Sequence, residues 1–439
     1  MPTLTFRKGV HPSYHKEGVS TAEIRSLTTP ETIRLPLVMH LGAPPTVLKK
    51  KGEEVAVGER IAEASSMISA HVHSPVAGKI KRLVQQPLPG GKLADYAEID
   101  VDVEATEAHE WAKRDVDLKS LGADEILAKI RDAGIVGMGG ATFPTDVKLK
   151  PPPSADVDVF IVNGAECEPY LSCDHRLMVE RATEILEGIR VVQQAVGFEK
   201  IYVGIEENKR DAIEAFEALA AVESEMPIAV VPLHVKYPQG AEKMLINAIT
   251  GRVVPAGSLP FEVGTVVSNV ATLHAIYEAV YLEKPLLDRT LTVSGSGIAE
   301  PGNYRALLGT PVSYIVEQCG GISEETNKVI MGGPMMGVAL PSLDYSVAKG
   351  TSGLLFFTAV DVPEERPCIR CGRCVAACPM NLMPLKLAGY AKAERFEDAK
   401  NLSLADCFEC GSCAYGCPSK IRLVSWIRYA KNYVRVHKI

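Results

Sequence analysis

Cys368-Ile-Arg-Cys371-Gly-Arg-Cys374-Val-Ala-Ala-Cys378-Pro379 and Cys407-Phe-Glu-Cys410-Gly-Ser-Cys413-Ala-Tyr-Gly-Cys417-Pro418 repeat one cysteine pattern. In each string, two residues separate the first three cysteines from one another, three residues precede the fourth cysteine, and proline follows it. Three thiolates at this spacing can wrap one face of a 4Fe-4S cubane, while the fourth, displaced by the proline turn, points toward a neighbouring cluster. The pattern therefore predicts two 4Fe-4S clusters that pass single electrons.

The spacing is that of bacterial ferredoxins, in which the fourth cysteine of each string binds the other cluster. We therefore assign the first cluster to Cys368, Cys371, Cys374 and Cys417, and the second cluster to Cys407, Cys410, Cys413 and Cys378. The alternative is a pair of zinc sites, because Cys-x2-Cys units also bind zinc. A zinc site needs only four ligands and does not require a third cysteine two residues further on or a fourth cysteine followed by proline. Both features occur twice in this chain, so the pattern favours iron and sulfide.

The composition is typical of a globular cytosolic protein. The chain has 439 residues, of which 46% are hydrophobic and 23% are charged, and its net charge of −7 argues against a nucleic-acid partner. No segment has the ~18 continuous apolar residues of a membrane helix, and residues 1–18 lack the apolar centre of a signal peptide. Eleven cysteines are many for the cytosol, where disulfides are disfavoured. Those outside the two strings, Cys167, Cys173 and Cys319, are expected to be small buried residues.

Residues 420–439 carry six lysine and arginine residues and no acidic residue. Such a basic segment with interspersed apolar residues could lie against an anionic membrane or an acidic partner. A solvated terminal helix is the alternative.

The N-terminal residues 1–112 alternate short β-rich runs with turn residues, as in residues 47–64, and predict an all-β unit. The segments around Gly52 and Gly78 resemble the paired hairpins of barrel-sandwich domains. Carriers of this type modify a lysine between the two halves, but the corresponding residues 62–70 contain none. We therefore expect a scaffold and not a swinging arm.

Residues 113–287 alternate apolar β-like runs with amphipathic helical segments, which predicts a Rossmann-like α/β domain with a mostly parallel sheet. The strand candidates are VFIVN, KIYVGI, IAVVPLHV and TVVSNV. A helix is expected at residues 123–134, where Ile126, Leu127 and Ile130 share a face and Gly134 can end it. Another is expected at residues 208–222, with Ile213, Phe216 and Leu219 aligned.

Residues 288–345 read as strand, Pro-Gly turn, strand and short helix, and resemble a small soluble-ligand-binding β-grasp module. A plain connector domain is the alternative. Residues 346–439 are expected to form a helical, bacterial-ferredoxin-type iron-sulfur domain. The fold class predicted for the whole chain is thus multidomain α/β.

A glycine-rich loop, residues 134–150 (GIVGMGGATFPTDVKLK), would let backbone approach a planar or phosphorylated ligand. It fits neither a phosphate-hydrolysis loop nor the dinucleotide fingerprint, so alone it is a weak signal. The segment NGAECEP, residues 163–169, follows a strand and places Glu166 and Glu168 where α/β sheets bind ligands. Two carboxylates and an asparagine suit ribose hydroxyls or a flavin edge, although exposed loop acids are common.

Four motifs occur in one order: GMGGATFPT with a later lysine, NGAECEP, YPQGAEKMLINAITGR and VSNVATL. Together they resemble the FMN and NADH motifs of the nucleotide-binding subunit of respiratory complex I. With the N-terminal β unit and the cysteine strings, nearly the whole chain resembles the C subunits of Rnf complexes, which are membrane-bound ferredoxin:NAD oxidoreductases that pump sodium ions or protons.

The resemblance implies binding residues position by position. It places FMN against Gly137, Gly139, Gly140, Lys148, Asn163, Glu166 and Asn269. It places Phe143 and Glu168 against the nicotinamide nucleotide, and Tyr237 and Glu242 near the flavin and its stacked nicotinamide. Two positions depart from complex I, which has arginine where Met138 stands and asparagine where Ser268 stands. No catalytic acid or base is expected, since hydride transfer needs none.

The resemblance implies an NAD-linked oxidoreductase subunit with two 4Fe-4S clusters and FMN as cofactors and NAD(H) as substrate. Its partners would be the other Rnf subunits, including the ferredoxin-accepting iron-sulfur subunit, and it would lie peripherally on the cytoplasmic face of the cell membrane. One alternative is an FMN and iron-sulfur cobalamin reductase of a diol-utilisation microcompartment. Another is a relay or scaffold subunit that binds no nucleotide.

Overall fold

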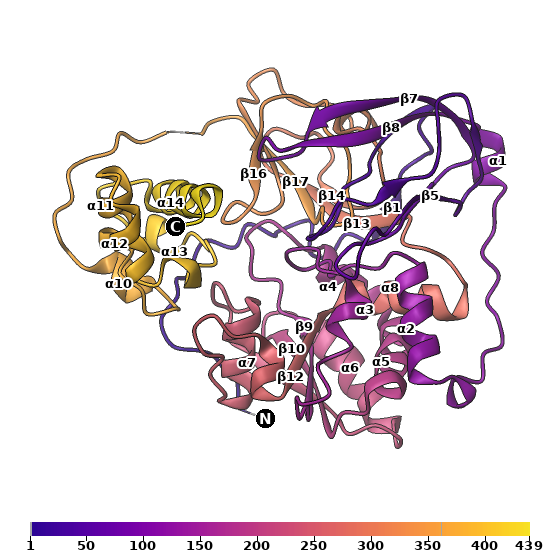
Figure 1. Cartoon of the computed structure of the whole chain (residues 1–439), viewed down its shortest axis with the longest axis horizontal. Coiled ribbons are helices and arrows are strands. Elements are labelled where there is room, and N and C mark those ends of the chain that lie inside the picture. The colour runs from indigo at the N-terminus through magenta and orange to yellow at the C-terminus, as the bar shows by residue number, and fades with distance from the viewer. Residues whose placement is uncertain (1, 361) are drawn as a thin grey trace.

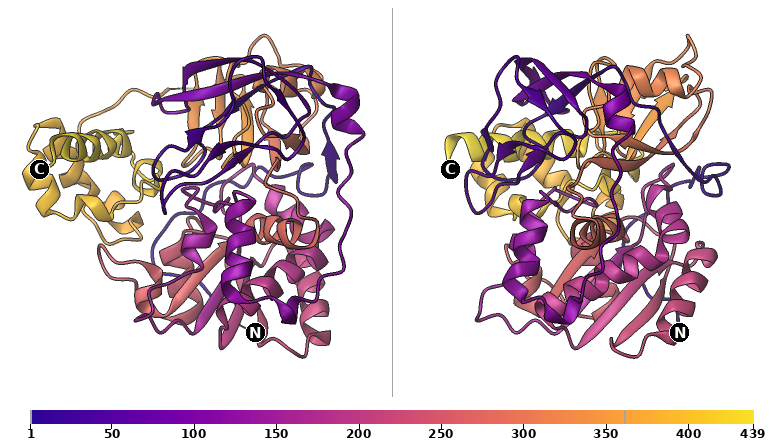
Figure 2. Two further views of the ribbon diagram at one scale, coloured as in Figure 1. Left: turned by 45° about the vertical axis from the view of Figure 1, so that its right-hand side comes forward. Right: turned by 90° about the vertical axis from the view of Figure 1, so that its right-hand side faces the viewer.

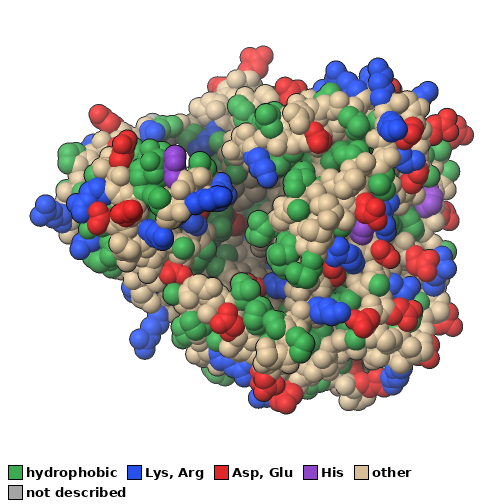
Figure 3. All heavy atoms as spheres, in the orientation of Figure 1, with side chains coloured by type: hydrophobic (Ala, Val, Ile, Leu, Met, Phe, Trp, Pro, Cys, Tyr) green, Lys and Arg blue, Asp and Glu red, His purple; other side chains and the backbone are tan. Residues whose placement is uncertain are grey.

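The computed structural model describes residues 2–360 and 362–439, which form three regions (Figure 1). An α/β domain occupies the lower part of the view, and two β-rich modules lie together above it. A helical C-terminal lobe stands to one side and is separated from the β-rich modules by a hollow (Figures 1 and 3). Among the described residues, no helix combines the length and the apolar composition needed to cross a bilayer.

The sheet of the α/β domain confirms the four predicted strands. They are β9 (Val159–Gly164), β10 (Lys200–Glu206), β11 (Ile228–Leu233) and β12 (Thr265–Asn269), all parallel and in the order β11-β10-β9-β12. Side chains alternate between the two faces, because Phe160 and Val162 belong to one hydrophobic core and Val159 and Ile161 to another. Both faces of the sheet are therefore covered.

The helices that cover the sheet follow the predicted periodicity. They are α2 (Ala123–Asp132), α3 (Thr145–Lys148), α4 (Cys173–Glu180), α5 (Ala182–Val196), α6 (Arg210–Val222), α7 (Glu242–Thr250) and α8 (Val270–Tyr281). In α2 the side chains of Ile126 and Ile130 are fully buried, and Gly134 adopts the left-handed conformation (φ +65°) just beyond the helix. Phe216 of α6 is also buried. The apolar stripes thus face one hydrophobic core, which α2 reaches through α5 and α8, as expected from their 3.6-residue spacing.

The two β-rich modules share one hydrophobic core, although the sequence separates them by the whole α/β domain. The N-terminal module contains β2 (Thr32–Pro36), β3 (Thr46–Val47), β4 (Glu54–Val55), β5 (Arg60–Glu63), β6 (Val72–His73), β7 (Gly78–Pro87), β8 (Leu93–Val101) and α1 (Val103–Glu107). Its strands form a four-stranded sheet, β2-β8-β7-β4, and a three-stranded sheet, β3-β5-β6. Ile33, Leu35 and Ile99 of this module pack in one cluster with Leu291 and Phe356 of the other.

The second β-rich module is a six-stranded sheet of order β1-β14-β13-β17-β15-β16. Its elements are β1 (Ile24–Ser26), β13 (Asp288–Ser294), β14 (Gly302–Leu307), α9 (Val312–Gln318), β15 (Lys328–Met331), β16 (Val338–Leu340) and β17 (Gly353–Phe357). β17 pairs with β13 and β15, so it belongs to this sheet, whereas the predicted boundary at residue 346 would assign it to the iron-sulfur domain.

The first residues of the chain also leave the module to which the predicted range 1–112 assigns them. Leu4 N–H donates to Pro232 O (2.9 Å) at the outer edge of the α/β sheet, and Val10 N–H donates to Tyr237 O (2.8 Å). β1 then pairs with β14 in parallel. The N-terminal segment thus runs across the molecule, because open strand edges offer unpaired N–H and C=O groups.

The C-terminal lobe contains α10 (Arg373–Ala377), α11 (Pro384–Lys392), α12 (Phe396–Asn401), α13 (Ser412–Tyr415) and α14 (Leu423–His437) (Figure 2). Leu423, Ile427 and Ala430 bury one face of α14, so the basic terminal segment is largely a helix packed within the lobe. The lobe is tied to the N-terminal segment as well, because Gly9 N–H donates to Ala377 O (3.2 Å).

Candidate functional site

The carboxyl ends of β9 and β12 bring two predicted asparagines together. The two strands are neighbours in the sheet, and Asn163 with Asn269 is the last pair in their register. The chain leaves β9 toward β10 on one side, while β12 lies on the other side, so this is the point where the strand order reverses. Open α/β sheets bind ligands in the crevice at such a point.

The glycine-rich loop closes over this crevice. Gly137 N–H donates to Phe143 O (2.9 Å), and Met138 N–H donates to the hydroxyl of Thr272 on α8 (3.0 Å). A Cβ atom on Gly139 would stand only 2.8 Å from the side-chain nitrogen of Asn269, so glycine is required for this close approach. Gly140 has no neighbouring atom within 4 Å of such a position. Backbone on that side of the loop is open to a ligand.

A cleft of about 650 Å³ lies between this loop and the C-terminal lobe. Its volume is in the range of sites that hold a cofactor. The predicted residues that line it are Gly137, Gly139, Gly140, Phe143, Lys148, Asn163, Glu242 and Asn269. Within it, the ammonium group of Lys148 and the carboxylate of Glu242 form an ion pair of 2.6 Å. Exposed backbone, two amide side chains and a cation fit the phosphate and polar ring edges of FMN.

The cleft is completed by residues that the sequence did not assign to a flavin site. Ala405, Asp406, Cys407, Phe408 and Lys431 come from the C-terminal lobe, and Met336 comes from the loop between β15 and β16. Phe408 could have been noticed as an aromatic residue between two cysteines of the second string. Nothing local to the other residues indicates the flavin cleft, because their place there depends on how the lobe docks.

Three of the predicted FMN and NADH residues are not part of the cleft lining. The carboxylate of Glu166 is buried and accepts hydrogen bonds from the backbone N–H groups of Asp174 (2.9 Å) and His175 (3.4 Å) at the start of α4. The hydroxyl of Tyr237 is buried as well and donates to the carbonyl oxygen of Cys410 (2.7 Å). It links the α/β domain to a cysteine of the second string.

Glu168, the third of these residues, holds the loop between β15 and β16. Its carboxylate accepts hydrogen bonds from the backbone N–H groups of Met335 (3.0 Å) and Met336 (2.9 Å). Burial raises the pKa of this carboxyl to about 7. The same loop reaches the C-terminal lobe, because a Cβ atom on Gly411 would stand 3.0 Å from the carbonyl oxygen of Met335. Glu168 therefore positions a loop that touches both the cleft and the lobe.

A polar cluster of Glu166, Cys173 and Asp174 lies next to the crevice, with the first two side chains buried and the third half-buried. Asn269 connects it to the crevice by donating to the carboxylate of Asp174 (2.7 Å). Burial raises the pKa of Glu166 and that of Asp174, and Lys16, which lies 3.9 Å from Glu166, offsets part of this effect for Glu166. Cys173 and Cys319 are buried, as predicted, whereas Cys167 is half-buried.

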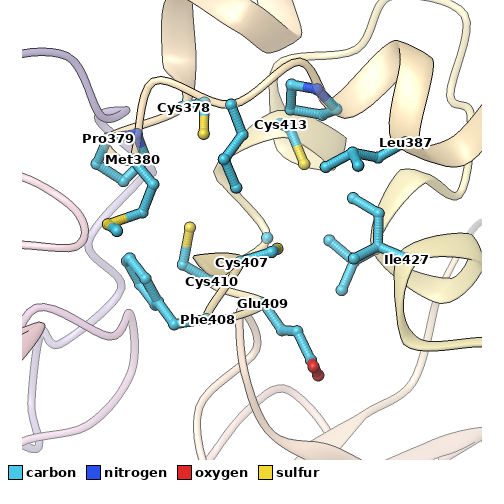
Figure 4. Close-up of a pocket in the computed structure, with 14 residues that line it drawn as sticks. Cys378, Pro379, Met380, Leu387, Cys407, Phe408, Glu409, Cys410, Cys413 and Ile427 are labelled. Carbon is cyan, nitrogen blue, oxygen red and sulfur yellow. The ribbon is translucent and has the colours of Figure 1, made fainter. Parts of the chain in front are cut away.

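The second string and the last cysteine of the first string surround one cavity. Cys378, Cys407, Cys410 and Cys413 line it, with Pro379, Leu387 and Ile427 as apolar neighbours. Figure 4 shows the four sulfur atoms directed into a common space. Burial raises the pKa of Cys407 to about 11 and that of Cys413 further. Grouped, buried thiols in an apolar wall are suited to a metal cluster, because metal binding supplies the positive charge that deprotonation needs.

The remaining cysteines, Cys368, Cys371, Cys374 and Cys417, do not line this cavity. Cys374 and Cys417 belong to one packed cluster with Leu423 and with Cys413 of the cavity, whereas Cys368 and Cys371 are exposed. The two strings also share their backbone conformation. In the first string Arg370 and Gly372 adopt positive φ angles (55° and 73°), and Glu409 and Gly411 do so at the matching positions of the second (63° and 83°). The two strings are therefore copies of one cluster-binding loop with the same backbone conformation at matching positions.

Comparison with known proteins accounts for all four parts of the chain. Family models match in order: an RnfC barrel sandwich hybrid domain at residues 4–104, a Nuo51 FMN-binding domain at 130–278, an SLBB domain at 290–339 and a 4Fe-4S dicluster domain at 367–421. Among solved structures, an NAD+-reducing [NiFe]-hydrogenase in the H2-reduced state aligns with a TM-score of 0.51 and 20% identity, covering 73% of this chain and 62% of that one. That likeness concerns the fold alone.

Curated relatives match at much higher identity. The C subunit of the proton-translocating ferredoxin:NAD(+) oxidoreductase complex of Clostridium ljungdahlii is 45% identical and aligns over 98% of this chain and 93% of its own length. Its counterpart in the Na(+)-translocating complex of Acetobacterium woodii is 43% identical over 98% and 97%. The counterpart in the ion-translocating oxidoreductase complex of Rhodobacter capsulatus is 43% identical over 98% and 83%. With this identity along nearly its whole length, the chain belongs to the family of C subunits of ion-translocating ferredoxin:NAD oxidoreductase (Rnf) complexes.

Proposed function

We propose that this chain is the NAD(H)-linked subunit of an ion-translocating electron-transport complex and exchanges electrons between ferredoxin-derived carriers and NAD. The observation that carries this proposal is the cleft in which the glycine-rich loop and Asn269 face Cys407 and Phe408 of the iron-sulfur lobe. A flavin bound there would lie beside the second cluster. Bound FMN exchanges a hydride with NAD(H) and single electrons with iron-sulfur clusters, which neither of those partners can do alone.

We assign the cluster ligands as the cysteine spacing predicts. Cys378, Cys407, Cys410 and Cys413 would hold the inner cluster, and their shared cavity supports this set. Cys368, Cys371, Cys374 and Cys417 would hold the outer cluster, and for this set the assignment rests on the spacing alone. Each string then contributes three ligands to one cluster and its fourth ligand to the other.

The residues of the cleft would bind and orient the flavin. The open backbone at Gly140 gives the ring and phosphate room, Lys148 offers a cation, and Asn163 and Asn269 offer amide groups at the sheet edge. Phe143 and Glu242 would bound the nicotinamide side of the cleft. Three predicted residues do not line the cleft and would act by positioning its surroundings. Glu166 would hold the start of α4, and Glu168 would hold the loop of Met335 and Met336. Tyr237 would hold the cysteine loop at Cys410.

We infer further that the α/β domain of residues 113–287 is of Rossmann-like design. We also infer that residues 288–345, within which the SLBB model matches residues 290–339, form a β-grasp module. The partners would be the other subunits of the complex, including its ferredoxin-accepting iron-sulfur subunit. Because both NAD(H) and ferredoxin are cytoplasmic, the chain would lie peripherally on the cytoplasmic face of the membrane.

Anaerobic reconstitution of the full chain with iron, sulfide and FMN tests the proposal. We expect about eight iron atoms and one flavin per chain, a paramagnetic signal after dithionite, and NADH-dependent reduction of ferricyanide. A brown preparation that binds no flavin and does not react with NADH would instead support a relay subunit. A colourless preparation with stoichiometric zinc would refute the redox assignment altogether.

A further inference from the structure

The iron-sulfur lobe has an inner and an outer end. At the inner end, Cys407 and Phe408 line the flavin cleft, and Phe408 packs with Met380 against the core of the α/β domain. At the outer end, Cys368 and Cys371 are exposed to solvent. The two cysteine loops share their backbone conformation, so the contrast in exposure comes from what covers them: Leu387 and Ile427 of the lobe cover the second string, and the α/β domain adjoins it. Of the eight cysteines in the two strings, all of which the structure describes, Cys368 and Cys371 are exposed, whereas Cys374 and Cys407 are half-buried and the others are buried.

The charge of the lobe contrasts with that of the whole chain. Residues 362–439 contain thirteen lysine and arginine residues and seven acidic ones, whereas the full chain carries −7. Several of the acids are already neutralised, because Glu365 pairs with Lys392, Asp398 with Arg395, and Glu409 with both Arg428 and Lys431. The C-terminal lobe thus has a net positive charge, whereas the rest of the chain has a net negative charge.

Its unpaired cations gather around the outer cysteines. Six exposed residues flank these ligands along the chain or lie on the adjoining start of α11, and we call them the outer edge: Arg366, Arg370, Arg373, Lys386, Lys420 and Arg422. Within residues 2–360 and 362–439, none of the six forms an ion pair with a carboxylate. Figure 3 shows lysine and arginine side chains on the lobe, among them some on the margin that faces away from the hollow, where acidic side chains also lie.

The outer edge also has an apolar centre. Ile369, between Cys368 and Arg370, is 68% exposed. Beside it, Arg366, Cys368, Leu385 and Ile421 line a groove of about 390 Å³. An apolar centre with a charged rim is the usual anatomy of a protein-protein contact. A positive rim selects a negative partner and accelerates its encounter.

We propose that the outer edge is the docking surface for an acidic, one-electron iron-sulfur carrier protein, which makes the cluster of Cys368 and Cys371 the entry point of the lobe. The inference rests on the proposed function and adds the direction in which the lobe is oriented: outer end to the carrier, inner end to the flavin. In each encounter the reduced carrier loses one electron and this chain gains one, and no bond is made or broken.

An anionic membrane surface is the competing occupant of a basic patch. The observations favour a protein, because the cations surround a groove and two exposed cysteines that would bind a cluster. Lipid binding does not require an exposed cluster, whereas electron transfer from another protein does. The basic residues farther along α14 do not form part of this surface. Arg428 and Lys431 are paired with Glu409, and the helix packs one face inside the lobe.

A binding experiment with matched variants tests the docking surface. The probe is a small, acidic 4Fe-4S ferredoxin in the oxidised state, labelled for fluorescence anisotropy and titrated with the full, reconstituted chain. The edge variant is Arg366→Glu/Arg373→Glu/Lys386→Glu. The control variant, Lys400→Glu/Arg435→Glu/Lys438→Glu, reverses three exposed charges of the same lobe on α12 and at the end of α14. Helix α12 is a suitable place for the control, because its side chains Phe396 and Ala399 pack in the hydrophobic cluster that contains Cys378 and not in the one that contains Cys374 and Cys417.

We expect the edge variant to bind the probe about tenfold more weakly than the wild type near 50 mM salt, and within about twofold of it near 0.5 M, because salt screens exposed charges. The control variant should bind like the wild type. The neutral variant Arg366→Gln/Arg373→Gln/Lys386→Gln should lie in between. Iron content and NADH:ferricyanide activity are measured in every protein and should not change, since none of these residues lines the cleft or ligates iron.

The proposal is overturned if the wild type fails to bind the probe at low salt, or if edge and control variants weaken binding equally. It is also overturned if the edge charges matter only for sedimentation with phosphatidylglycerol vesicles, which would identify a membrane surface instead. A wild-type chain that lacks iron or NADH activity would contradict the proposed function itself, and that result is distinct from a loss of carrier binding alone.

Discussion

Removing the hydroxyl group of Tyr237 should loosen the attachment of the iron-sulfur lobe to the α/β domain. This side chain is 1% exposed, and its hydroxyl donates to the carbonyl oxygen of Cys410 at 2.7 Å across 173 residues of sequence. Tyr237→Phe keeps the ring and its packing but leaves a buried carbonyl without this donor. An unsatisfied buried acceptor costs about 1–3 kcal/mol. Since 1.4 kcal/mol is a factor of ten, the population of the undocked lobe should rise roughly five- to 150-fold.

Amide hydrogen exchange of the holoprotein measures this opening directly, because local opening and exchange share one free energy. We expect faster exchange in residues 407–415 and unchanged exchange in β9 and β10. Tyr415→Phe is the matched control, since its side chain is 50% exposed in the same lobe. Gly257 N–H still donates to Asp406 (3.0 Å), so the lobe should stay attached on average. The reasoning fails if residues 407–415 exchange at the wild-type rate, or if the central strands become equally labile.

Three further changes test other parts of the site. Gly139→Ala places a methyl group 2.8 Å from the side chain of Asn269, and this side chain cannot move freely because it caps α8 and donates a hydrogen bond to Asp174. The affinity for FMN, measured by fluorescence, should therefore fall about tenfold. The control variant Gly122→Ala should leave the affinity unchanged, since no atom lies within 4 Å of the added methyl group. The double variant Cys378→Ala/Cys410→Ala removes two ligands of one cluster and should cost about four iron atoms per chain. Cys374→Ala/Cys378→Ala should cost about eight, because these two cysteines of one string bind different clusters. Equal losses would contradict the assignment of each string's fourth cysteine to the other cluster. Burial raises the pKa of Glu168 from 4.5 to about 7, so the native state binds more protons between these values and stability should fall by about 3 kcal/mol as pH rises through that window. Denaturant unfolding of Glu168→Gln should lack this slope and that of Glu104→Gln, an exposed control, should keep it.

Local chemistry explains why some features were predictable. The cysteine strings carry their ligand spacing within twelve residues each, and the strands β9 to β12 are apolar runs whose pairing follows from alternation with amphipathic helices. The resemblance to complex I placed Asn163 and Asn269 at one ligand site, and their pairing at the end of neighbouring parallel strands brings them together. In these cases the determining interactions lie close in sequence or follow from a regular period.

Other features depended on contacts that leave no local pattern. The carboxylates of Glu166 and Glu168 looked like nucleotide ligands, yet backbone N–H groups of α4 and of Met335 and Met336 engage them. A hydrogen bond to a main-chain group can be made by any residue, so the partner sequence gives no sign of it.

By itself the sequence determined the chemistry of this protein: the cysteine spacing that suits two cubanes, the α/β order and the glycine-rich loop. Tertiary structure alone decided that the N-terminal segment completes a distant sheet, that two β-rich modules share a core, and that the lobe presents Cys407 to the cleft and Cys368 to solvent. The physical reason is that spacing acts along a few residues, whereas docking depends on how whole surfaces bury apolar area and satisfy main-chain groups across the molecule.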